Sequence, residues 1–399
     1  MDTARRHPWQ LFLIRRPPGI HPPDRVPNGL FELPHLSIFA MPSFHRLTIK
    51  DIRRETQHAV SIAFYIPDTV ADRFVFRHGQ YLTLEACISG ERIRRCYSIC
   101  SGEDDGEVRV AIKEVAGGRF SRFANRVLKI GDALNVMEPA GRFTFSLDPT
   151  SSRTYLAVAC GSGITPIMSI SKTVLAREPN SRILLIYGNR TREDTIFLAE
   201  LEGLIDRYPG RFDVRHVFSR EALDASQPHG RIDGEKVSAI LLDRFGIDAP
   251  SHTFLCGPDT MIESVRERLH NDGVNPSSIY SERFSPVSLT GATKSSSNDV
   301  RLAGDFENLD VEVRLDGHVF VIDIKAGETI VEAACRAGIN VPFSCNAGMC
   351  CTCRAKILDG QVVARPGHAL DSSEVDVGFV LTCQVCPATQ GVVIDYDAQ

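Results

Sequence analysis

The periodicity of apolar positions changes along the chain. Over residues 44–147 apolar and polar residues alternate, as at Val108, Arg109 and Val110, and turn sequences such as residues 104–106 separate the alternating segments. Alternation with a period of two predicts antiparallel strands that bury one face. A small closed β-barrel is the natural architecture for such a set of strands.

From residue 155 onward, continuous apolar runs alternate with helical segments. The runs suit buried parallel strands, and they are residues 155–159, 183–187, 212–218 and 252–256. The helical segments between them include residues 166–177 and 259–270. This order predicts repeated β-α-β units and therefore a Rossmann-like α/β sheet.

A glycine turn follows the first of these predicted strands. Gly161 and Gly163 lie between the strand and a helix that carries Thr165 and Pro166 near its first turn. Glycines at such a turn let the backbone approach a pyrophosphate, and the helix N-terminus favours negative charge. The same residues would also suit an ordinary tight turn, so the motif alone leaves both interpretations open.

The two ends of the chain follow other patterns. Residues 1–41 contain repeated proline pairs and scattered arginines without a sustained period, which predicts a disordered, dispensable extension. Residues 285–308 are rich in Ser, Gly, Thr and Asn, which predicts a flexible linker. The remaining residues alternate and then become helical, which predicts a small α+β domain. The expected boundaries are 1–41, 42–148, 151–284, 285–308 and 309–399.

Composition narrows the classes of protein. The chain has 399 residues, too many for one ordinary core, and a formal net charge of -5, which gives no reason to expect nucleic acid as a partner. No apolar stretch is long enough to span a bilayer, so we expect no membrane segment. Twelve cysteines without a secretory signal favour a reducing, cytoplasmic location.

Four cysteines near the C-terminus carry the most specific chemical signal. Cys345, Cys350 and Cys353 have the spacing Cys-x4-Cys-x2-Cys, and Cys383 follows after a long gap. This is the spacing of a plant-type 2Fe–2S cluster, held by thiolates from one loop and one distant segment. A zinc site is the alternative, although zinc ligands usually come in pairs with x2 spacing. Two neighbouring cysteines do not fit the pattern and are expected to be buried free thiols, namely Cys351 and Cys386.

Further motifs resemble those of the ferredoxin–NADP reductase superfamily. The segment that contains Arg95, Tyr97 and Ser98 resembles its flavin motif, and residues 117–121 resemble its flavin-phosphate loop. Residues 256–261 are similar to its Cys-Gly-Pro-x-x-Met signature. With the cysteines last, the chain resembles hybrid reductases that supply multicomponent oxygenases. The resemblance implies an antiparallel β-barrel FAD domain, an NAD(P) domain and a β-grasp-like 2Fe–2S ferredoxin domain.

The resemblance also implies roles for the residues of the flavin motifs. Arg95 would bind the flavin pyrophosphate, Tyr97 would pack on the isoalloxazine ring, and Ser98 would hydrogen-bond near its N5 atom. Gly118 and Ser121 would contact phosphate through the backbone and the hydroxyl group. Without the resemblance, Arg95 would be a solvated strand charge, Tyr97 a barrel aromatic, and the glycine part of a plain turn.

On the nucleotide side, the resemblance assigns positions at the end of a strand. Cys256, followed by Gly257 and Pro258, would lie near the nicotinamide C4 and position the hydride donor. Phe284 resembles the aromatic residue that borders the flavin face. The residues themselves would equally allow a packing cysteine at 256 and a hydrophobic interface residue at 284.

The choice of nucleotide depends on residues after the second and third α/β strands. Ser219 and Arg220 resemble the pair that holds the 2′-phosphate of NADPH in relatives, and Arg190 adds positive charge. No acidic residue stands immediately after Tyr187 and Gly188 to bind a free 2′-hydroxyl group. We expect NADPH, with plain surface charge as the alternative role of Arg220.

The expected function is electron transfer from NADPH to FAD, from FAD to the 2Fe–2S cluster, and from there to an oxygenase component. The segments 94–101, 117–121, 187–192 and 348–354 most resemble the reductases of phenylacetyl-CoA epoxidases. This implies the di-iron epoxidase of phenylacetate catabolism as the partner. Two alternatives remain open: the reductase of another aromatic-ring or steroid hydroxylase, and a non-enzymatic electron carrier or redox sensor.

Overall fold

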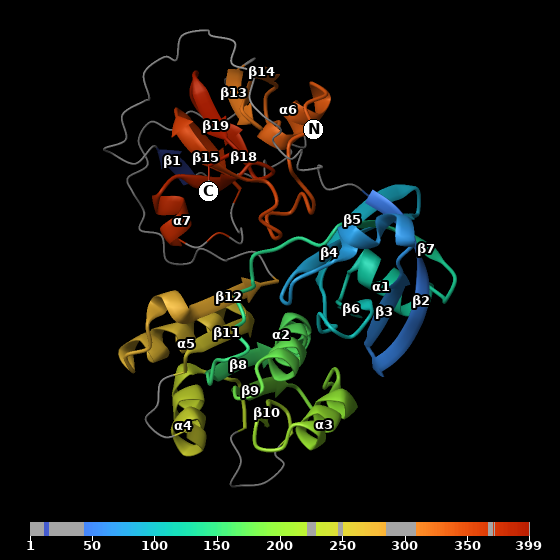
Figure 1. Ribbon diagram of the computed structural model, residues 1–399. Helices are drawn as coiled ribbons and strands as arrows, with labels where there is room; N and C mark the ends of the chain where they lie inside the picture. Colours follow the sequence, from blue (N-terminus) through green and yellow to red (C-terminus); the bar gives the residue numbers. More distant parts are fainter. Residues whose placement is uncertain are drawn as a thin grey trace, which may run out of the picture. The chain divides into compact units, whose positions relative to one another are not determined.

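The structure is a computed structural model that describes residues 12–15, 44–221, 229–245, 250–284, 309–365, 370 and 372–398. The chain forms two compact units (Figure 1). The larger unit is Phe44–Phe284, and the smaller unit combines Met1–Ser43 with Ser285–Gln399. The expected linker, residues 285–308, lies outside the described residues.

The first part of the larger unit is an antiparallel β-barrel, as predicted. Its sheet has the strand order β5-β4-β7-β2-β3-β6. The strands are β2 (Phe44–Thr56), β3 (Ala59–Tyr65), β4 (Tyr81–Ile88), β5 (Glu91–Ser98), β6 (Val108–Lys113) and β7 (Ala133–Met137). A bridge between Ile99 and Val110 links the end of β5 to β6 and closes the barrel. The short helices η1 (Asp68–Phe74) and α1 (Arg119–Arg126) add Phe74, Phe120 and Ala124 to its core.

The second part of the larger unit is a parallel α/β sheet. Its strands are β8 (Thr154–Cys160), β9 (Arg182–Asn189), β10 (Phe212–Phe218), β11 (His252–Gly257) and β12 (Ile279–Arg283), in the order β10-β9-β8-β11-β12. All four pairings are parallel. From β8 the strand order runs outward to β9 and β10 on one side and to β11 and β12 on the other. Ligands of open α/β sheets bind at the carboxyl ends of the strands at such a switch point.

Helices cover both faces of this sheet. They are α2 (Ile164–Arg177), α3 (Leu198–Arg207), α4 (Gly234–Phe245) and α5 (Asp259–Asn271). Ile167 of α2 and Leu201 of α3 belong to the hydrophobic core on one face. Val237 of α4 and Val265 of α5 belong to the core on the other face. The strands are therefore buried on both sides, which explains their continuous apolar sequences.

The acidic turn between β5 and β6 forms ion pairs with α2. Arg177 donates to both carboxylate oxygens of Asp104, at 2.8 and 2.7 Å, and Lys172 pairs with Asp105 at 2.7 Å. A Cβ atom on Gly102 would lie 2.9 Å from the Cβ of Lys172. The barrel and the helix that follows the glycine turn thus share a close, charged contact.

The smaller unit is a compact α+β domain, and the predicted fold class is confirmed for all three domains. Its main sheet has the order β14-β13-β19-β15-β17, and a second sheet has the order β1-β16-β18. The elements are β13 (Leu309–Leu315), β14 (His318–Ile324), α6 (Ile330–Arg336), β15 (Arg354–Asp359), β16 (Gln361–Ala364), α7 (Ser372–Asp376), β17 (Phe379–Leu381), β18 (Val385–Pro387) and β19 (Val392–Asp395). Helix α6 buries Ile330 and Ala334 against this core, and its capping box at Thr329 and Glu332 fixes where it begins.

The expectation of a disordered N-terminal extension is wrong at four residues. Strand β1 (Phe12–Arg15) pairs antiparallel with β16, from Phe12 opposite Ala364 to Arg15 opposite Gln361. Without β1, one edge of β16 would carry no strand partner, and such an edge is a template for pairing. The rest of residues 1–43 lies outside the described residues.

Within the described ranges, no helix has the length and apolar character needed to cross a membrane.

Candidate functional site

The predicted flavin residues lie at the end of β5. The ring of Tyr97 is 5.7 Å from that of Phe120 at a tilt of 39°, and burial raises the pKa of the Tyr97 hydroxyl group well above its ordinary value. Arg95 is exposed and donates from its guanidinium to the Arg94 carbonyl at 2.6 Å. An uncharged, packed ring beside an exposed cation is a suitable arrangement for a flat cofactor that ends in a pyrophosphate.

Ser121 forms hydrogen bonds across the predicted phosphate loop. Ser121 Oγ accepts the backbone N–H of Val115 at 3.2 Å and donates to the Gly118 carbonyl at 3.3 Å. A Cβ atom on Gly118 would collide with Ser121 Oγ and lie 2.6 Å from a methyl group of Val115. A side chain at position 118 would therefore require the side chains of Ser121 and Val115 to move.

Strand β12 brings a carboxyl group to the flavin motif. Ser98 Oγ donates to Glu282 Oε2 at 2.9 Å, although the two residues are 184 positions apart. Desolvation raises the pKa of Glu282 to about 7, with the Ser98 hydrogen bond opposing it. Glu282 also faces Cys256 in the pairing of β12 with β11. Residues expected on the flavin side and the nicotinamide side thus converge on one carboxyl group.

The predicted nicotinamide residues lie against the glycine turn. Cys256 is fully buried at the end of β11, and burial raises the pKa of its thiol well above the usual value. A Cβ atom on Gly163 would collide with the Cys256 carbonyl, and one on Gly257 would lie 2.8 Å from the methyl carbon of Met261. The backbone of the glycine turn at Gly163 therefore packs directly against the backbone of β11 at Cys256.

The glycine turn itself is rigid. Tyr187 Oη donates to the Gly161 carbonyl at 2.9 Å, and Thr165 Oγ1 donates to the Ser162 carbonyl at 3.0 Å. Gly161 has a φ of +54°, which favours glycine. Pro258 precedes α5 in an extended conformation, as a helix N-cap. Thr165 is satisfied inside the turn, so its hydroxyl group supports the loop.

Sequence reasoning missed one cation beside this turn. Lys113, the last residue of β6, lies with its Nζ atom 3.5 Å from the position of a Cβ on Gly161. Burial lowers the pKa of Lys113, while the charge of Asp194 opposes that effect and the charge of Arg190 adds to it. The sequence did contain one signal for this cation, because Lys113 ends an alternating strand just before the predicted phosphate loop.

The residues expected to select NADPH meet at the carboxyl ends of β9 and β10. Backbone hydrogen bonds join Ser219 to Asn189 at 3.0 Å and Arg220 to Arg190 at 2.9 Å, and both arginines are exposed. A carboxylate lies close by, because Glu221 accepts the backbone N–H of Arg192 at 2.9 Å. The structure thus brings two cations together as expected and sets one acidic residue beside them.

Phe284 follows β12 directly and has 40% of its surface exposed. It lies at the end of the larger unit, two residues after Glu282. An exposed aromatic ring at this position is compatible with the predicted place beside a flavin.

The cysteines of the smaller unit are surrounded by hydrogen-bond donors. Ala347 and Met349 donate backbone N–H groups to Cys345 Sγ at 3.3 and 3.4 Å, and Thr352 Oγ1 donates to Cys350 Sγ at 3.2 Å. Asn346, Gly348 and Cys351 have φ values of +51°, +73° and +53°, so the loop turns its N–H groups inward. Donors that point at sulfur suit anionic thiolates.

The fourth cysteine, Cys383, follows β17, which pairs with β15. Thr382 bonds twice to the Cys353 carbonyl, through its backbone N–H at 3.0 Å and its hydroxyl group at 2.8 Å. This contact brings Cys383 against Cys353, and their hydrogen-bond contact lowers the pKa of Cys383 and raises that of Cys353. The structure therefore brings the distant cysteine to the x4-x2 loop, and the four-cysteine ligand set of a 2Fe–2S cluster stays a prediction.

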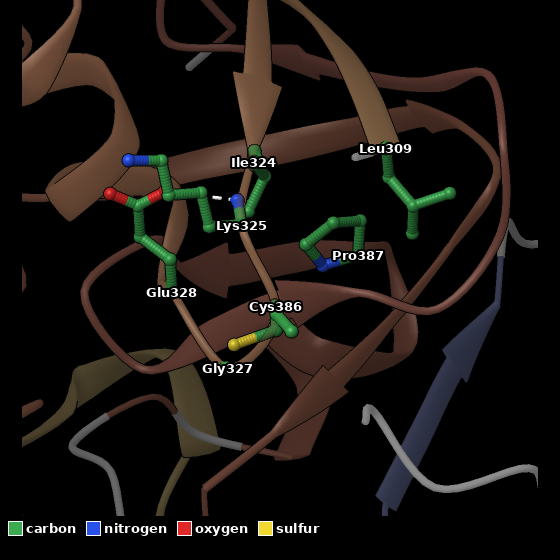
Figure 2. Close-up of a pocket in the computed structure, with 8 residues that line it drawn as sticks. Leu309, Ile324, Lys325, Gly327, Glu328, Cys386 and Pro387 are labelled. Atoms are coloured by element: carbon green, nitrogen blue, oxygen red, sulfur yellow. Dashed lines mark hydrogen bonds between the residues drawn. The ribbon is translucent and has the colours of Figure 1, made fainter. Parts of the chain in front are cut away.

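Cys386 takes no part in this set. It lies at a small pocket that also involves Leu309, Ile324, Gly327 and Pro387, where the Lys325 backbone N–H donates to Glu328 Oε2 at 3.0 Å (Figure 2). Burial raises the pKa of Cys386 to about 12, as expected for an inert packing thiol.

Three protein families match the chain in order. Residues 48–145 match the oxidoreductase FAD-binding domain, residues 157–267 the oxidoreductase NAD-binding domain, and residues 313–388 the 2Fe-2S iron-sulfur cluster binding domain. The chain is 40% identical over 360 residues to one subunit of the 1,2-phenylacetyl-CoA epoxidase of Escherichia coli, and the match covers 90% of this chain and 99% of that protein. The chain belongs to the ferredoxin–NADP reductase family.

Other relatives align along nearly their whole length. The reductase is 32% identical to the ferredoxin reductase component of 3-ketosteroid-9-alpha-monooxygenase from Rhodococcus rhodochrous, over 92% of this chain and 99% of that one. The solved structure of phthalate dioxygenase reductase, a modular structure for electron transfer from pyridine nucleotides to [2Fe-2S], aligns with a TM-score of 0.55 at 24% identity. That alignment covers 88% of the reductase and 98% of the other chain, so the fold extends over the three domains.

The comparisons confirm the predicted enzyme class. The reductase is an oxidoreductase with domains for FAD, a pyridine nucleotide and a 2Fe–2S cluster, and its relatives are components of oxygenase systems. The local geometry fits these cofactors, because the flavin loop is crowded at Gly118 and backbone N–H groups point at a cysteine sulfur. The individual residue roles stay predictions.

Proposed function

We propose that the reductase takes electrons from NADPH and delivers them to the di-iron phenylacetyl-CoA epoxidase of phenylacetate catabolism. The observation that carries this proposal is the 40% identity to a component of that enzyme along 99% of the component's length. Epoxidation of the ring would take place on the partner. We include a cytoplasmic location in the proposal, because a chain that holds a cluster on cysteine thiolates suits a reducing compartment.

In this proposal, Ser98 and Glu282 handle the proton that accompanies the electrons. FAD, when bound, accepts a hydride as an electron pair and releases single electrons. Glu282, with a pKa of about 7, can hold a proton on Oε2 near neutral pH, and Ser98 Oγ at 2.9 Å can pass it on. Tyr97 would hold the flavin ring, and Cys256 would limit how close the nicotinamide can approach.

The preference for NADPH is supported by charge. Arg190 and Arg220 are joined through their backbones at 2.9 Å and present two exposed cations at one strand edge. A 2′-phosphate carries charge that guanidinium groups bind in a bidentate manner. Glu221 beside them works against this preference, so the ratio of NADPH to NADH use measures which charge dominates.

A second candidate partner is a steroid or aromatic-ring oxygenase. The 32% identity to a 3-ketosteroid-9-alpha-monooxygenase reductase component supports it, over the same share of the chain but with fewer identical residues. The non-enzymatic alternative has no support from a chain that belongs throughout to an oxidoreductase family.

Reconstitution with candidate oxygenases tests the proposal. The holoenzyme is mixed with a phenylacetyl-CoA oxygenase or with a ketosteroid oxygenase, and NADPH consumption is recorded with and without substrate. We expect coupled consumption with phenylacetyl-CoA alone. Ferricyanide reduction serves as the control, since it measures the flavin half independently of the partner, and coupling only to the steroid system would contradict the proposal.

A further inference from the structure

Gln384 is the residue directly after the fourth cysteine, in the turn between β17 and β18. It is 6% exposed. Its Nε2 atom lies 2.7 Å from the Cys383 carbonyl, 3.2 Å from the Asn346 carbonyl and 3.4 Å from Cys383 Sγ. One buried amide group therefore touches both segments that carry the cysteines.

The orientation of this amide follows from its partners. The two carbonyl oxygens can only accept hydrogen bonds, so the nitrogen and not the oxygen of the side chain must face them. The NH2 group has two N–H bonds for three acceptors, so one N–H donates to the Asn346 carbonyl and the other is shared between the carbonyl and the Sγ atom of Cys383. A wrong assignment of the amide would bring three acceptors together in a buried place, which is costly.

The backbone on both sides holds Gln384 in position. Its N–H donates to the Leu381 carbonyl at 2.7 Å, and its carbonyl accepts the N–H of Arg365 at 2.8 Å. The Asn346 carbonyl accepts from the Gln384 side chain at 3.2 Å, which adds a contact with the cysteine loop. These bonds hold the Gln384 amide in place, so little reorganisation is needed for it to face a bound cluster.

We propose that Gln384 sets the reduction potential of the 2Fe–2S cluster by donating its amide N–H to Cys383 Sγ. Reduction would add one negative charge near this sulfur, and both Cys383 and Gln384 are buried. A fixed N–H dipole stabilises that charge more than it stabilises the oxidised state, and hydrogen bonds to the sulfurs are known determinants of cluster potential. This inference rests on the proposed passage of electrons through the cluster.

The hydrogen bond from Gln384 would shift the electron equilibrium between the flavin and the cluster. With the donor in place, the cluster accepts an electron from the flavin side more readily. Without it the potential falls, and the equilibrium between the two centres moves toward the flavin. Gln384 is therefore a positioning residue that acts through Cys383, and its effect is expected in the potential even when the cluster content is unchanged.

The test is a redox titration of the full-length holoprotein with its cluster, followed by EPR. Gln384→Met keeps the length of the side chain and removes the donor. We expect full iron and sulfide with a tenfold fall in the one-electron equilibrium constant, about 59 mV toward negative potential. Tyr396→Phe is the matched control, because it removes a hydroxyl group that donates to Thr382 Oγ1 at 2.8 Å on the same segment, and this hydrogen bond goes to a threonine and not to a cysteine sulfur.

The outcomes are distinct. A Gln384→Met protein with full cluster and the potential of the control would overturn the inference and leave the proposed function intact. If this variant fails to assemble its cluster, pulsed EPR of the reduced wild-type protein decides, with the glutamine side-chain amide labelled with ¹⁵N. We expect hyperfine coupling to that nitrogen, and its absence would also overturn the inference. A wild-type protein without NADPH-reducible cluster would instead contradict the proposed function.

Discussion

Ser98 and Glu282 are 184 positions apart and meet at 2.9 Å, so that the last strand of the α/β sheet supplies an acid to the flavin motif of the barrel. Neither domain contains this pair by itself. The protonation chemistry of the proposed flavin site therefore depends on the two domains of the larger unit being docked.

The pH dependence of flavin reduction should follow Glu282. Its pKa is raised from 4.5 to about 7, so the folded protein binds this proton more tightly than the unfolded chain does. The free energy of unfolding should accordingly fall as pH rises from about 4.5 to about 7 and then level off. Ferricyanide reduction by NADPH depends on the folded state alone, so it should decline as the pH rises through about 7.

Glu282→Gln should remove that inflection and lower kcat by about 100-fold, which is within the usual contribution of a positioned acid. Glu235→Gln is the control, since this side chain is 80% exposed on α4. A Glu282→Gln enzyme with the wild-type pH profile would show that the proton travels by another route.

Replacing any one of Cys345, Cys350, Cys353 and Cys383 by serine should remove or destabilise the cluster and leave the flavin bound, because thiolate is the preferred ligand of this iron. Iron and sulfide analysis and the visible spectrum measure the effect. Cys351→Ser should be benign. A serine variant with full iron, full sulfide and an unchanged spectrum would remove that position from the ligand set.

Arg220→Ala should lower the ratio of kcat/KM for NADPH over NADH by about 10- to 100-fold, the value of one charged hydrogen bond of about 1.5–3 kcal/mol. Steady-state kinetics with both nucleotides measure it. Arg244→Ala is the matched control, because Arg244 pairs with Asp213 near the opposite, amino end of β10. An unchanged ratio in Arg220→Ala would mean that specificity has another source.

Gly163→Ala should destabilise the larger unit and raise KM for NADPH, because the new methyl group would collide with the Cys256 carbonyl. Overpacking of this kind costs about 1–3 kcal/mol. Gly203→Ala in α3 is the control, since a Cβ there meets no atom within 4 Å and should stabilise the helix by about 1 kcal/mol. Thermal unfolding compares the two, and equal melting temperatures would contradict the packing argument.

A chain that begins at Met41 should keep FAD binding and NADPH oxidation, because β1 pairs with the smaller unit and not with the barrel. Flavin content and ferricyanide reduction are the measurements. Loss of either would show that the first 40 residues belong to the flavin fold. Faster proteolysis of the smaller unit, by contrast, would agree with the loss of a strand partner for β16.

The sequence predicted what depends on local periodicity and spacing. The alternation around Val108 indicated the barrel, and the x4-x2 cysteine spacing indicated the donor set, because both signals lie within one turn or strand. Contacts between distant segments carry no such signal. The bond between Ser98 and Glu282, the approach of Lys113 to Gly161 and the amide of Gln384 all depend on tertiary packing, so they required the structure.

The pairing of β1 with β16 makes the smaller unit discontinuous in sequence. A ferredoxin module cut out as residues 309–399 would lack Phe12–Arg15, and one side of β16 would be open to pairing with another molecule. Protein engineers who want this cluster domain as a portable electron carrier would therefore gain from grafting a short β-strand onto that edge, or from blocking it with a charged residue.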